Sequence, residues 1–525
     1  MPHVVLLGLG LVFFLGCIVF SIIVPADLSK LITINGQNNS HHIIGRQLIL
    51  SKGNYFTGIE YGVAANFQSG KLVQLAREVN AVRWGDECST NFYINGSSSK
   101  CLNLNVYQCT PIQDQFLPVL VYFHEGETNW DSTANLDAKQ VIDNLACKGM
   151  VVVSVNYRAS IFGGFSFQHP NPAITDVQLA LEWVNKNIKH FNGDSNQITA
   201  MGSRKGAQII SYLSQMPKTR MLFSQVILIG GTADDPDIFD NNRYFTFQQI
   251  QKMALRFQCI DENKDPETMS RSEQDGVIEC MNGVRKQAIL RLDKRLRQFW
   301  NRWPIDTRTC QNPVGKSTEK SINKQRLTKV LQLNRDLKRT HNPEAFTEHY
   351  LNLFSEDSMG TMRALKQIRT NFMEVAPLLL EAHRLSSQPD SNVFLFNMET
   401  RNTRYDYNPE LDKQKTNFDQ WKKKASANDD MSAQKFMSES IANFVINGNP
   451  NKINSSDLKW PKFSPIATTG TYNSLKVNAK GIEVVENWER STAQFWLCEQ
   501  ERARKCQHKC PLFLNYLKFT LIELD

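Results

Sequence analysis

The sequence lacks several features that would place the chain in a specialised class of proteins. No internal repeat or long low-complexity run occurs, which excludes solenoids and collagen-like folds. Neither charge dominates, because 60 Lys and Arg stand against 52 Asp and Glu, and this mild excess gives no argument for nucleic acid as a partner. Walker loops, dinucleotide-binding motifs and metal-ligand spacings are also missing, so we expect no cofactor and no bound metal.

What is present is the composition of a large folded protein. Apolar residues make up 41% of the chain and charged residues 21%, which is typical of globular domains. A chain of 525 residues can bury a large core, and large α/β enzymes often occupy this length as one unit.

One long apolar run lies at the N-terminus, where Val4 to Val24 contains no charged residue. We interpret residues 1–26 as a secretory signal peptide, with Ser21 or Ala26 at the cut. The alternative is a retained membrane anchor, because a run of this length can span a bilayer. No second such run follows, so the sequence predicts a secreted protein or one anchored at its N-terminus.

The cysteines agree with export. Of 11 cysteines, Cys17 lies in the apolar run, and the other ten are an even number, as an oxidised framework would need. Cys506 and Cys510 flank His508, a pattern that favours a disulfide element over zinc in an oxidising compartment. Three glycosylation acceptors would matter in the same compartment: Asn38, Asn95 and Asn454.

The middle of the chain has the pattern of a parallel α/β sheet. Apolar runs predict strands at 118–123, 150–155, 197–201 and 225–229. Apolar spacing predicts a helix from Thr175, its cap, to about 190, and a second helix from the turn at 202–206 through Leu213. Strands that alternate with helices indicate a sheet covered on both faces.

Several segments match ordered motifs of one family. They are 55–64, 101–107, Asn156-Tyr157-Arg158 with Phe162-Gly163, the helix from Asp176 to Asn187, 191–199, 443–451 and Trp460-Pro461. Together they resemble the cholinesterase and type B carboxylesterase family, from about Gly45 to Trp496. The resemblance implies the α/β-hydrolase fold, with a large, mostly parallel twisted sheet and helices on both faces. It implies one domain over 27–525, including a basic insertion at about 285–340 and a cysteine-containing tail at about 497–525.

The position of the family's nucleophile is altered. The family carries its catalytic serine in G-x-S-x-G, on a strained turn between a strand and a helix. The corresponding segment here is Gly202-Ser203-Arg204-Lys205-Gly206. Arg204 takes the place of the serine, and a guanidinium cannot attack a carbonyl. Ser203 is the alternative nucleophile, but such a turn directs only its middle residue at a substrate.

The other parts of the family's active site are also altered. The loop whose backbone N–H groups stabilise an oxyanion has two glutamates, in His124-Glu125-Gly126-Glu127. No histidine occurs between His383 and His508, where the family has its base. The family's acidic residue is not recognisable between 304 and 342. The chain therefore resembles a pseudoenzyme, because the members of a triad act as a unit.

Two functions of different classes follow from this resemblance. The first is a non-catalytic extracellular protein with a binding or adhesion surface, similar in that respect to neuroligins, neurotactin, gliotactin and glutactin. The second is an ester hydrolase with a rearranged site. Fold alone does not decide between them. The resemblance leaves a homodimer open, and the partner would be another protein or an acidic glycan.

One segment is unusually basic. Residues 285–339 contain 16 Lys and Arg and 4 Asp and Glu, a net charge of +12. One interpretation is a solvated insertion, in which Ile289, Leu292 and Leu296 have helical spacing. The other is a docking patch for an acidic glycan or an acidic protein.

The family resemblance also implies two disulfides, Cys88–Cys101 and Cys259–Cys280. A third family bridge is not expected, because Ala493 stands where its last cysteine would be. The sequence leaves six cysteines unpaired: Cys109, Cys147, Cys310, Cys498, Cys506 and Cys510.

Arg204 should also find a carboxylate, because a buried guanidinium without a partner is costly. Glu127 is the first choice and Glu125 the second, and such a pair would plug the former catalytic cleft. The alternative is that Arg204 extends to solvent.

Overall fold

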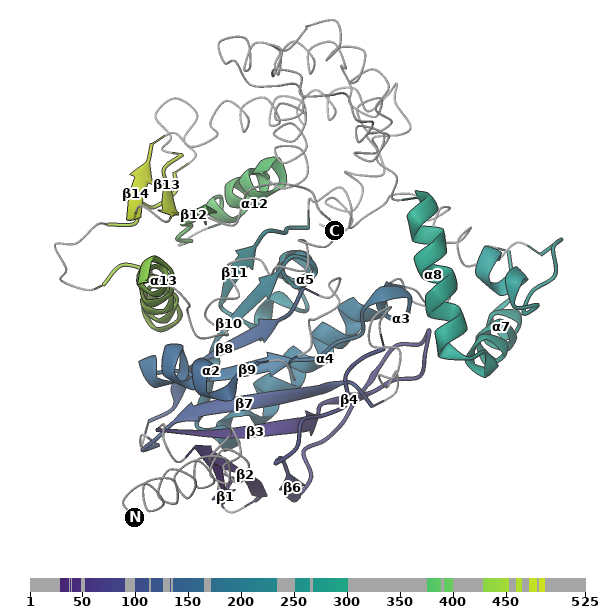
Figure 1. Ribbon diagram of the computed structural model, residues 1–525, viewed down its shortest axis with the longest axis horizontal. Helices are drawn as coiled ribbons and strands as arrows, with labels where there is room; N and C mark the ends of the chain where they lie inside the picture. Colours follow the sequence, from purple (N-terminus) through teal and green to yellow (C-terminus); the bar gives the residue numbers. More distant parts are fainter. Residues whose placement is uncertain are drawn as a thin grey trace, which may run out of the picture.

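The main sheet of the computed structural model joins an antiparallel half to a parallel half (Figure 1). The antiparallel half contains β1 (Ser29–Asn35), β2 (His42–Leu48), β3 (Gly53–Glu60) and β7 (Asn103–Cys109), with β6 (Glu78–Asn80) beside β2. The parallel half contains β9 (Val151–Val155), β8 (Leu117–Phe123), β10 (Gly193–Ser203) and β11 (Gln225–Ile229), in that spatial order. The sheet is thus mixed. Its parallel half carries the strand-to-helix turn at 202–206, which we call the elbow.

The structure describes these residues: 29–36, 38, 40–48, 52–89, 100–112, 115–125, 133, 136–164, 171–233, 251–264, 268–300, 375–388, 391–399, 428–452, 459–464, 472–478 and 481–486. The apolar run Val4 to Val24 lies outside them, and within them no helix has the length and hydrophobicity to cross a membrane.

Strand β8 shows why helices cover both faces of the sheet. Its alternate residues Val119, Val121 and Phe123 are buried among the apolar side chains of α4 (Pro172–Asn187) and α5 (Lys205–Gln215). Leu120 and Tyr122 point to the opposite face, among residues of α2 (Ala138–Asn144) and α13 (Asn428–Asn447). Because successive strand residues face opposite sides, a strand that is apolar throughout needs cover on both.

The remaining elements lie around this sheet. Helices α7 (Arg271–Gly283) and α8 (Lys286–Trp300) pack against the short helix α3 (Ser160–Gly164) through the core residues Phe162, Met281 and Ile289. A separate sheet contains β12 (Leu395–Glu399), β13 (Ser474–Asn478) and β14 (Gly481–Val485), near α12 (Ala376–Ser386). The shorter elements are β4 (Gly62–Val63), β5 (Lys71–Leu72), η3 (Ala146–Lys148), η4 (Ile188–Phe191) and η5 (Arg220–Leu222).

Most predicted elements of the parallel half are confirmed. The strands predicted at 118–123, 150–155 and 225–229 are β8, β9 and β11, and the strand at 197–201 is the central part of the longer β10. The predicted start of α4 at Thr175 is wrong by three residues. Pro172 begins the helix after Asn171, and Thr175 lies within the first turn, where its hydroxyl donates to Pro172 O. The helical spacing of Ile289 and Leu292 is confirmed by α8, whereas 301–374 lie outside the described residues.

Candidate functional site

The predicted elbow is present in the backbone. Strand β10 ends at Ser203, α5 begins at Lys205, and Arg204 between them has φ 45° and ψ −110°. A positive φ is costly for a residue with a side chain, so this turn is strained. The Arg204 N–H donates to Ile229 O at 2.8 Å, which fixes the turn against the neighbouring strand β11. The chain therefore forms the sharp strand-to-helix turn without a serine at its middle residue.

Close backbone packing explains why glycines remain at this turn. A Cβ on Gly202 would lie 2.4 Å from Ala207 N, and a Cβ on Gly206 would lie 2.5 Å from Phe123 O. Either contact is far shorter than real Cβ contacts allow, and backbone atoms cannot move aside cheaply. The two glycines are required by the fold, whether or not the turn carries a nucleophile.

Arg204 pairs with the altered oxyanion loop. Its Nε lies 3.4 Å from Glu125 Oε1, and the Glu125 side chain is only 5% exposed. The Arg204 side chain is 48% exposed, so of the two alternatives the structure agrees with an Arg204 that extends to solvent, not with a buried plug. The aliphatic part of Arg204 is long enough to reach solvent while its Nε stays near the buried carboxylate. Gly126 and Glu127, the first choice of partner, lie outside the described residues.

Ser203, the alternative nucleophile, faces inward. It is 2% exposed, and its Oγ donates to the same Glu125 Oε1 at 3.4 Å. Burial separates this hydroxyl from the solvent side of the turn, where Arg204 projects. Ser203 and Arg204 thus both contact the same carboxylate oxygen, Glu125 Oε1.

The histidine of the oxyanion loop has a packing role. His124 is buried, and its ring stacks on Tyr157 with 4.5 Å between ring centroids. The Tyr157 hydroxyl donates to His124 O at 2.6 Å. These contacts fix the backbone that leads from β8 to Glu125.

His383, the last histidine before the long gap, belongs to an aromatic cluster. Its Nε2 lies 2.6 Å from the Tyr472 hydroxyl, and its ring meets the edge of Phe463. Burial lowers the pKa of His383 below its usual value. Both aromatic residues lie in the small core that joins α12 to the separate sheet, so His383 stabilises that junction.

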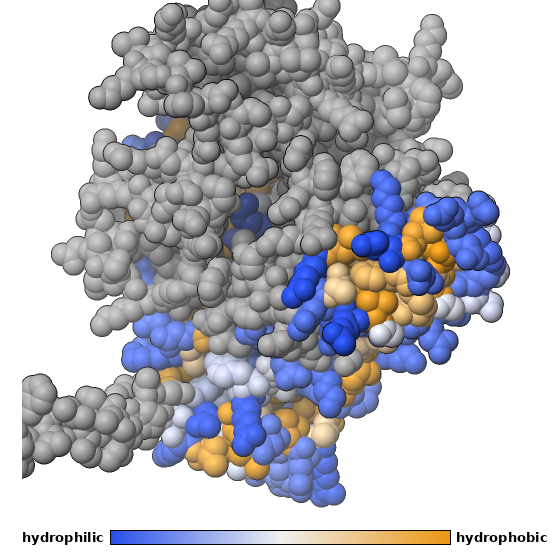
Figure 2. All heavy atoms as spheres, turned by 45° about the vertical axis from the view of Figure 1, so that its right-hand side comes forward, coloured by the Kyte–Doolittle hydropathy of each residue, from blue (hydrophilic) through white to orange (hydrophobic). Residues whose placement is uncertain are grey.

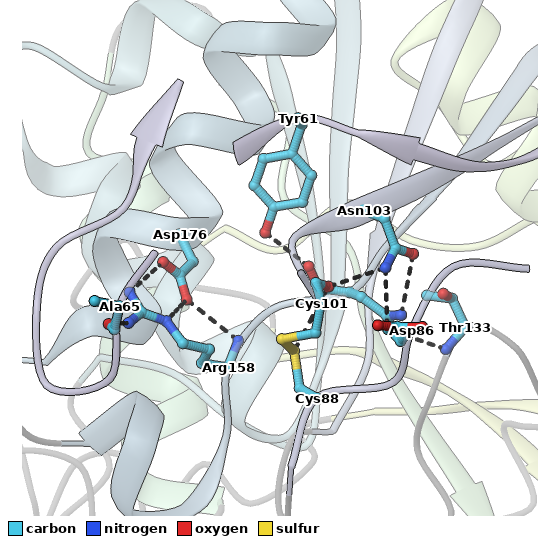
Figure 3. The surroundings of a disulfide bond; sticks show 10 residues. Tyr61, Ala65, Asp86, Cys88, Cys101, Asn103, Thr133, Arg158 and Asp176 are labelled. Carbon is cyan, nitrogen blue, oxygen red and sulfur yellow. Dashed lines mark hydrogen bonds and ion pairs between the residues drawn. A yellow bond between two sulfur atoms is a disulfide. The ribbon is translucent and has the colours of Figure 1, made fainter. Parts of the chain in front are cut away.

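A buried ion pair joins the segment after β9 to helix α4 (Figure 3). Arg158 Nη2 lies 2.7 Å from Asp176 Oδ1, and Arg158 Nε donates to Asp176 Oδ2 at 2.7 Å. The side chains are 1% and 0% exposed, and Arg158 Nη1 also donates to Ala65 O and Gln68 O. Burial raises the pKa of Asp176, and the hydrogen bonds and charge of Arg158 oppose that rise. The sequence marked both residues as family motifs but gave no sign that they pair.

Beside this pair, a polar network surrounds the first disulfide (Figure 3). Asn103 Nδ2 donates to Asp86 O and Cys101 O, and Asn156 Nδ2 donates to Asn103 Oδ1. The Tyr61 hydroxyl donates to Asn156 O, and burial raises the pKa of Tyr61 well above its usual value. The network connects β3, β7 and β9 through groups that would otherwise be buried without partners.

Both predicted disulfides are confirmed. Cys88 pairs with Cys101 and Cys259 pairs with Cys280. The structure adds a bridge that the sequence could not assign, Cys109–Cys147, which joins the end of β7 to η3. Four cysteines lie outside the described residues: Cys310, Cys498, Cys506 and Cys510.

Of the three glycosylation acceptors, one can be placed. Asn38 is exposed between β1 and β2, with φ 55°. Asn95 and Asn454 lie outside the described residues. Across the described part of the chain, no group of three His, Cys, Asp or Glu side chains is arranged to hold a metal ion.

The sheet, its helical layers and the strained turn after β10 define an α/β-hydrolase fold. Comparison with known protein families agrees: the carboxylesterase family matches residues 56–306 and 303–496. The chain belongs to this family.

Relatives that match parts of the chain include both esterases and other members. Glutactin of Drosophila melanogaster is 34% identical over 218 residues, which cover 38% of this chain and 21% of glutactin. Esterase cest-33 of Caenorhabditis elegans is 37% identical over 140 residues, 25% of each chain. Neuroligin-1 of the same organism is 30% identical over 202 residues, 36% of this chain and 24% of neuroligin-1. The matches thus span a quarter or less of the length of these three relatives.

Solved structures support the fold alone. Juvenile hormone esterase from Manduca sexta superimposes with a TM-score of 0.63 at 16% identity, covering 90% of this chain and all of that one. A thermophilic pNB esterase gives 0.61, also at 16% identity.

Proposed function

We propose that this protein is a non-catalytic, extracellular, cholinesterase-like member of the carboxylesterase family, which acts as a binding or adhesion surface for another protein or an acidic glycan. The observation that carries the proposal is Arg204 at the middle of an otherwise intact elbow. Its guanidinium pairs with Glu125, a carboxylate in the loop that would have to stabilise an anion. Acyl transfer requires an electron-rich nucleophile at the elbow and hydrogen-bond donors that stabilise an oxyanion. Here the elbow carries the cation Arg204, and the oxyanion loop carries the anion Glu125.

The histidine count supports the same proposal. The triad needs a histidine base that takes the proton of the nucleophile, and the sequence has no histidine between His383 and His508. His383 Nε2 contacts the Tyr472 hydroxyl, and the His383 ring packs in the small core that joins α12 to the separate sheet.

The alternative is an ester hydrolase with a rearranged site, and one contact favours it. Ser203 Oγ donates to Glu125 Oε1, so a hydroxyl and a candidate carboxylate base are adjacent. Against it, Ser203 is buried, and the contact has the length of a weak hydrogen bond.

Labelling with a serine-reactive fluorophosphonate separates the two functions. We expect no labelled protein and no turnover of p-nitrophenyl butyrate above the background of the Ser203→Ala variant. An active family esterase in the same assay shows that the reagents work. Labelling that disappears in Ser203→Ala would reject the non-catalytic proposal in favour of the alternative.

The binding surface is proposed to include the basic segment 285–339, whose described part consists of Arg285 and α8. Arg285 and Arg291 are exposed on the lobe that α7 and α8 form, where Figure 2 shows hydrophilic residues around an apolar patch. Apolar side chains that are only partly buried there include Leu255, Phe257 and Leu292. Cations beside apolar groups suit an acidic glycan or an acidic protein.

Heparin tests the glycan part of this proposal. The variant Arg285→Ser/Arg291→Ser should elute from heparin at lower salt than the parent, because fewer cations bind the polyanion. The matched control is Lys71→Ser/Lys218→Ser, which removes two exposed cations elsewhere. Equal elution of both variants would place the contact outside α8. The proposal places the protein outside the cell by secretion, with anchoring through the N-terminal apolar run as the alternative, and fractionation of the expressed protein separates the two. Sedimentation tests for the homodimer that the resemblance leaves open.

A further inference from the structure

Two histidine rings meet where the connection between β1 and β2 crosses η4. The centroids of His41 and His190 are 4.4 Å apart, and the rings meet edge to face. We propose that this pair is a pH-sensitive joint, which holds the β1–β2 hairpin against the domain near neutral pH and loosens it when both rings become cationic.

The domain side of the joint is rigid. His190 lies in η4 between Ile188 and Phe191, whose exposed fraction is zero, and the Phe191 ring meets the edge of Phe56 from β3. A ring that sits between two buried anchors cannot swing away from a new charge without disturbing the core. Repulsion therefore acts on the partner that can move, the hairpin.

The hairpin side is packed closely on His190. A Cβ on Gly36 would lie only 2.9 Å from His190 Nδ1, and the Gly36 N–H donates to His41 O at 2.7 Å. His41 Nδ1 lies 2.9 Å from Ala76 O. Because a carbonyl oxygen only accepts, His41 Nδ1 is the donor of this hydrogen bond.

The charged groups around His190 add to the repulsion. Burial, then His41 and then Lys189 lower the pKa of His190 below its ordinary value. On the hairpin and the neighbouring strand, Arg77 is exposed, and Glu78 pairs in register with His42, whose Nδ1 bonds to Asn35 Oδ1. Glu78 thus lies opposite His42 in the register of the sheet.

The lowered pKa of His190 determines whether acid strengthens or weakens the attachment of the hairpin. A lowered pKa means that the folded joint binds a proton less readily than the released hairpin does. The attachment is therefore complete above the ordinary pKa of a histidine side chain, about 6.5, and it is lost as the pH falls through the lowered pKa of His190.

Release would loosen the pairing of His42, Ile43 and Ile44 with β6 and would leave the strands from β3 onward paired. Strand β1 is an edge strand whose pairing in the described residues is with β2, from Ser29↔Leu48 to Asn35↔His42. The other end of β2 stays fixed, because Arg46 and Gln47 pair with β3. The joint thus controls the segment through which residues 1–28 connect to the domain.

Hydrogen–deuterium exchange of the full-length protein tests the joint. Between about pH 7.5 and about pH 5, exchange corrected for its intrinsic rate should become about tenfold faster in peptides of residues 29–45, a change that corresponds to about 1.4 kcal/mol of repulsion. Peptides of α4 should not change. The variants His41→Gln and His190→Gln should each abolish the acceleration, and the double variant should add nothing.

The matched control is His42→Gln, which removes a neighbouring histidine outside the ring contact and should keep the acceleration. As a second measurement, exchange of the imidazole C2 hydrogen reports the pKa of His190, and His41→Gln should raise that pKa toward its ordinary value. Circular dichroism near neutral pH verifies that the variants are folded. An unmoved His190 pKa, equal acceleration across the whole domain, or loss of the effect in His42→Gln would each overturn the proposal. None of these outcomes depends on whether the protein is an esterase.

Discussion

The protein contains two arginine–carboxylate pairs that differ in almost every physical respect. Arg158 and Asp176 are joined by two contacts of 2.7 Å, and neither side chain is more than 1% exposed. Arg204 and Glu125 are joined by one contact of 3.4 Å, and half of the Arg204 side chain is exposed. The first pair belongs to the frame of the fold, and the second belongs to the position where the family's chemistry would occur.

The difference lies in how deeply each guanidinium is buried. Arg158 Nη1 donates to Ala65 O and Gln68 O, so the side chain connects the loop after β4, the segment after β9 and helix α4. Arg204 projects from a strained turn toward solvent. A buried charge that loses its partner is costly, whereas an exposed charge is rehydrated. The frame should therefore tolerate substitution far less than the altered catalytic position.

Replacement of Arg158 by Met should have the largest effect. The variant strands a buried carboxylate and two carbonyl groups, so the free energy of unfolding should fall by about 3–5 kcal/mol. Urea denaturation followed by circular dichroism measures the loss. Arg158→Lys is the control for charge alone and should recover only part of the stability, because an ammonium cannot form the two-pronged contact. A loss below about 1 kcal/mol would contradict the structural role.

Replacement of Gly206 by Ala should have an intermediate effect. The added Cβ would meet Phe123 O, so the turn must shift, at a cost of about 1–3 kcal/mol. The matched control is Gly276→Ala in α7, where nothing lies within 4 Å and alanine should favour the helix. Thermal melting of both variants checks the contrast. Equal melting temperatures would show that the turn is less tightly packed than these contacts require.

Replacement of Arg204 by Ala should cost about 1–2 kcal/mol, because the exposed guanidinium contributes little but the Glu125 carboxylate that it leaves is buried. Glu125 keeps its contact with Ser203 in this variant. The same urea titration measures the change. A loss as large as that of Arg158→Met would mean that the second pair is buried in solution, and it would restore the plug expected from the sequence.

Replacement of Arg204 by Ser should have the smallest effect on function, namely none. The variant restores a hydroxyl at the elbow, yet the base is still missing and Glu125 still opposes an oxyanion. Hydrolysis of p-nitrophenyl acetate should equal that of the parent. Turnover well above the parent would reveal a base that the histidine positions do not indicate.

Local patterns predicted the parallel half of the sheet well. Strands β8, β9 and β11 agree with their predicted ranges within one residue, because buried apolar runs report the strands directly. The start of α4 was misjudged because Thr175 was taken as the capping residue. The helix instead begins at Pro172, a residue type favoured at the first helical position, after Asn171 in the left-handed region. The antiparallel half gave a weaker signal, since β1 mixes exposed and half-buried residues.

Contacts between distant segments could be predicted only through the family. The resemblance supplied Cys88–Cys101, but Cys109–Cys147 depends on how the end of β7 approaches η3, which no local pattern encodes. Glu125 was the second-choice partner of Arg204, and the exposure of that arginine depends on packing that residue types do not reveal. Arg158 and Asp176 stood in separate motifs, and only the fold brings them together.

The disulfide between Cys109 and Cys147 has a mechanical consequence. It closes a loop of the chain that contains all of β8, and Cys88–Cys101 closes another loop just before β7. A pulling force applied to the ends of the chain passes through the sulfur atoms and bypasses the residues inside each loop. Strand β8 can therefore not be extended while the bridge is intact, whatever the load. Under tension, the centre of the parallel half is protected by covalent connectivity in addition to its hydrogen bonds.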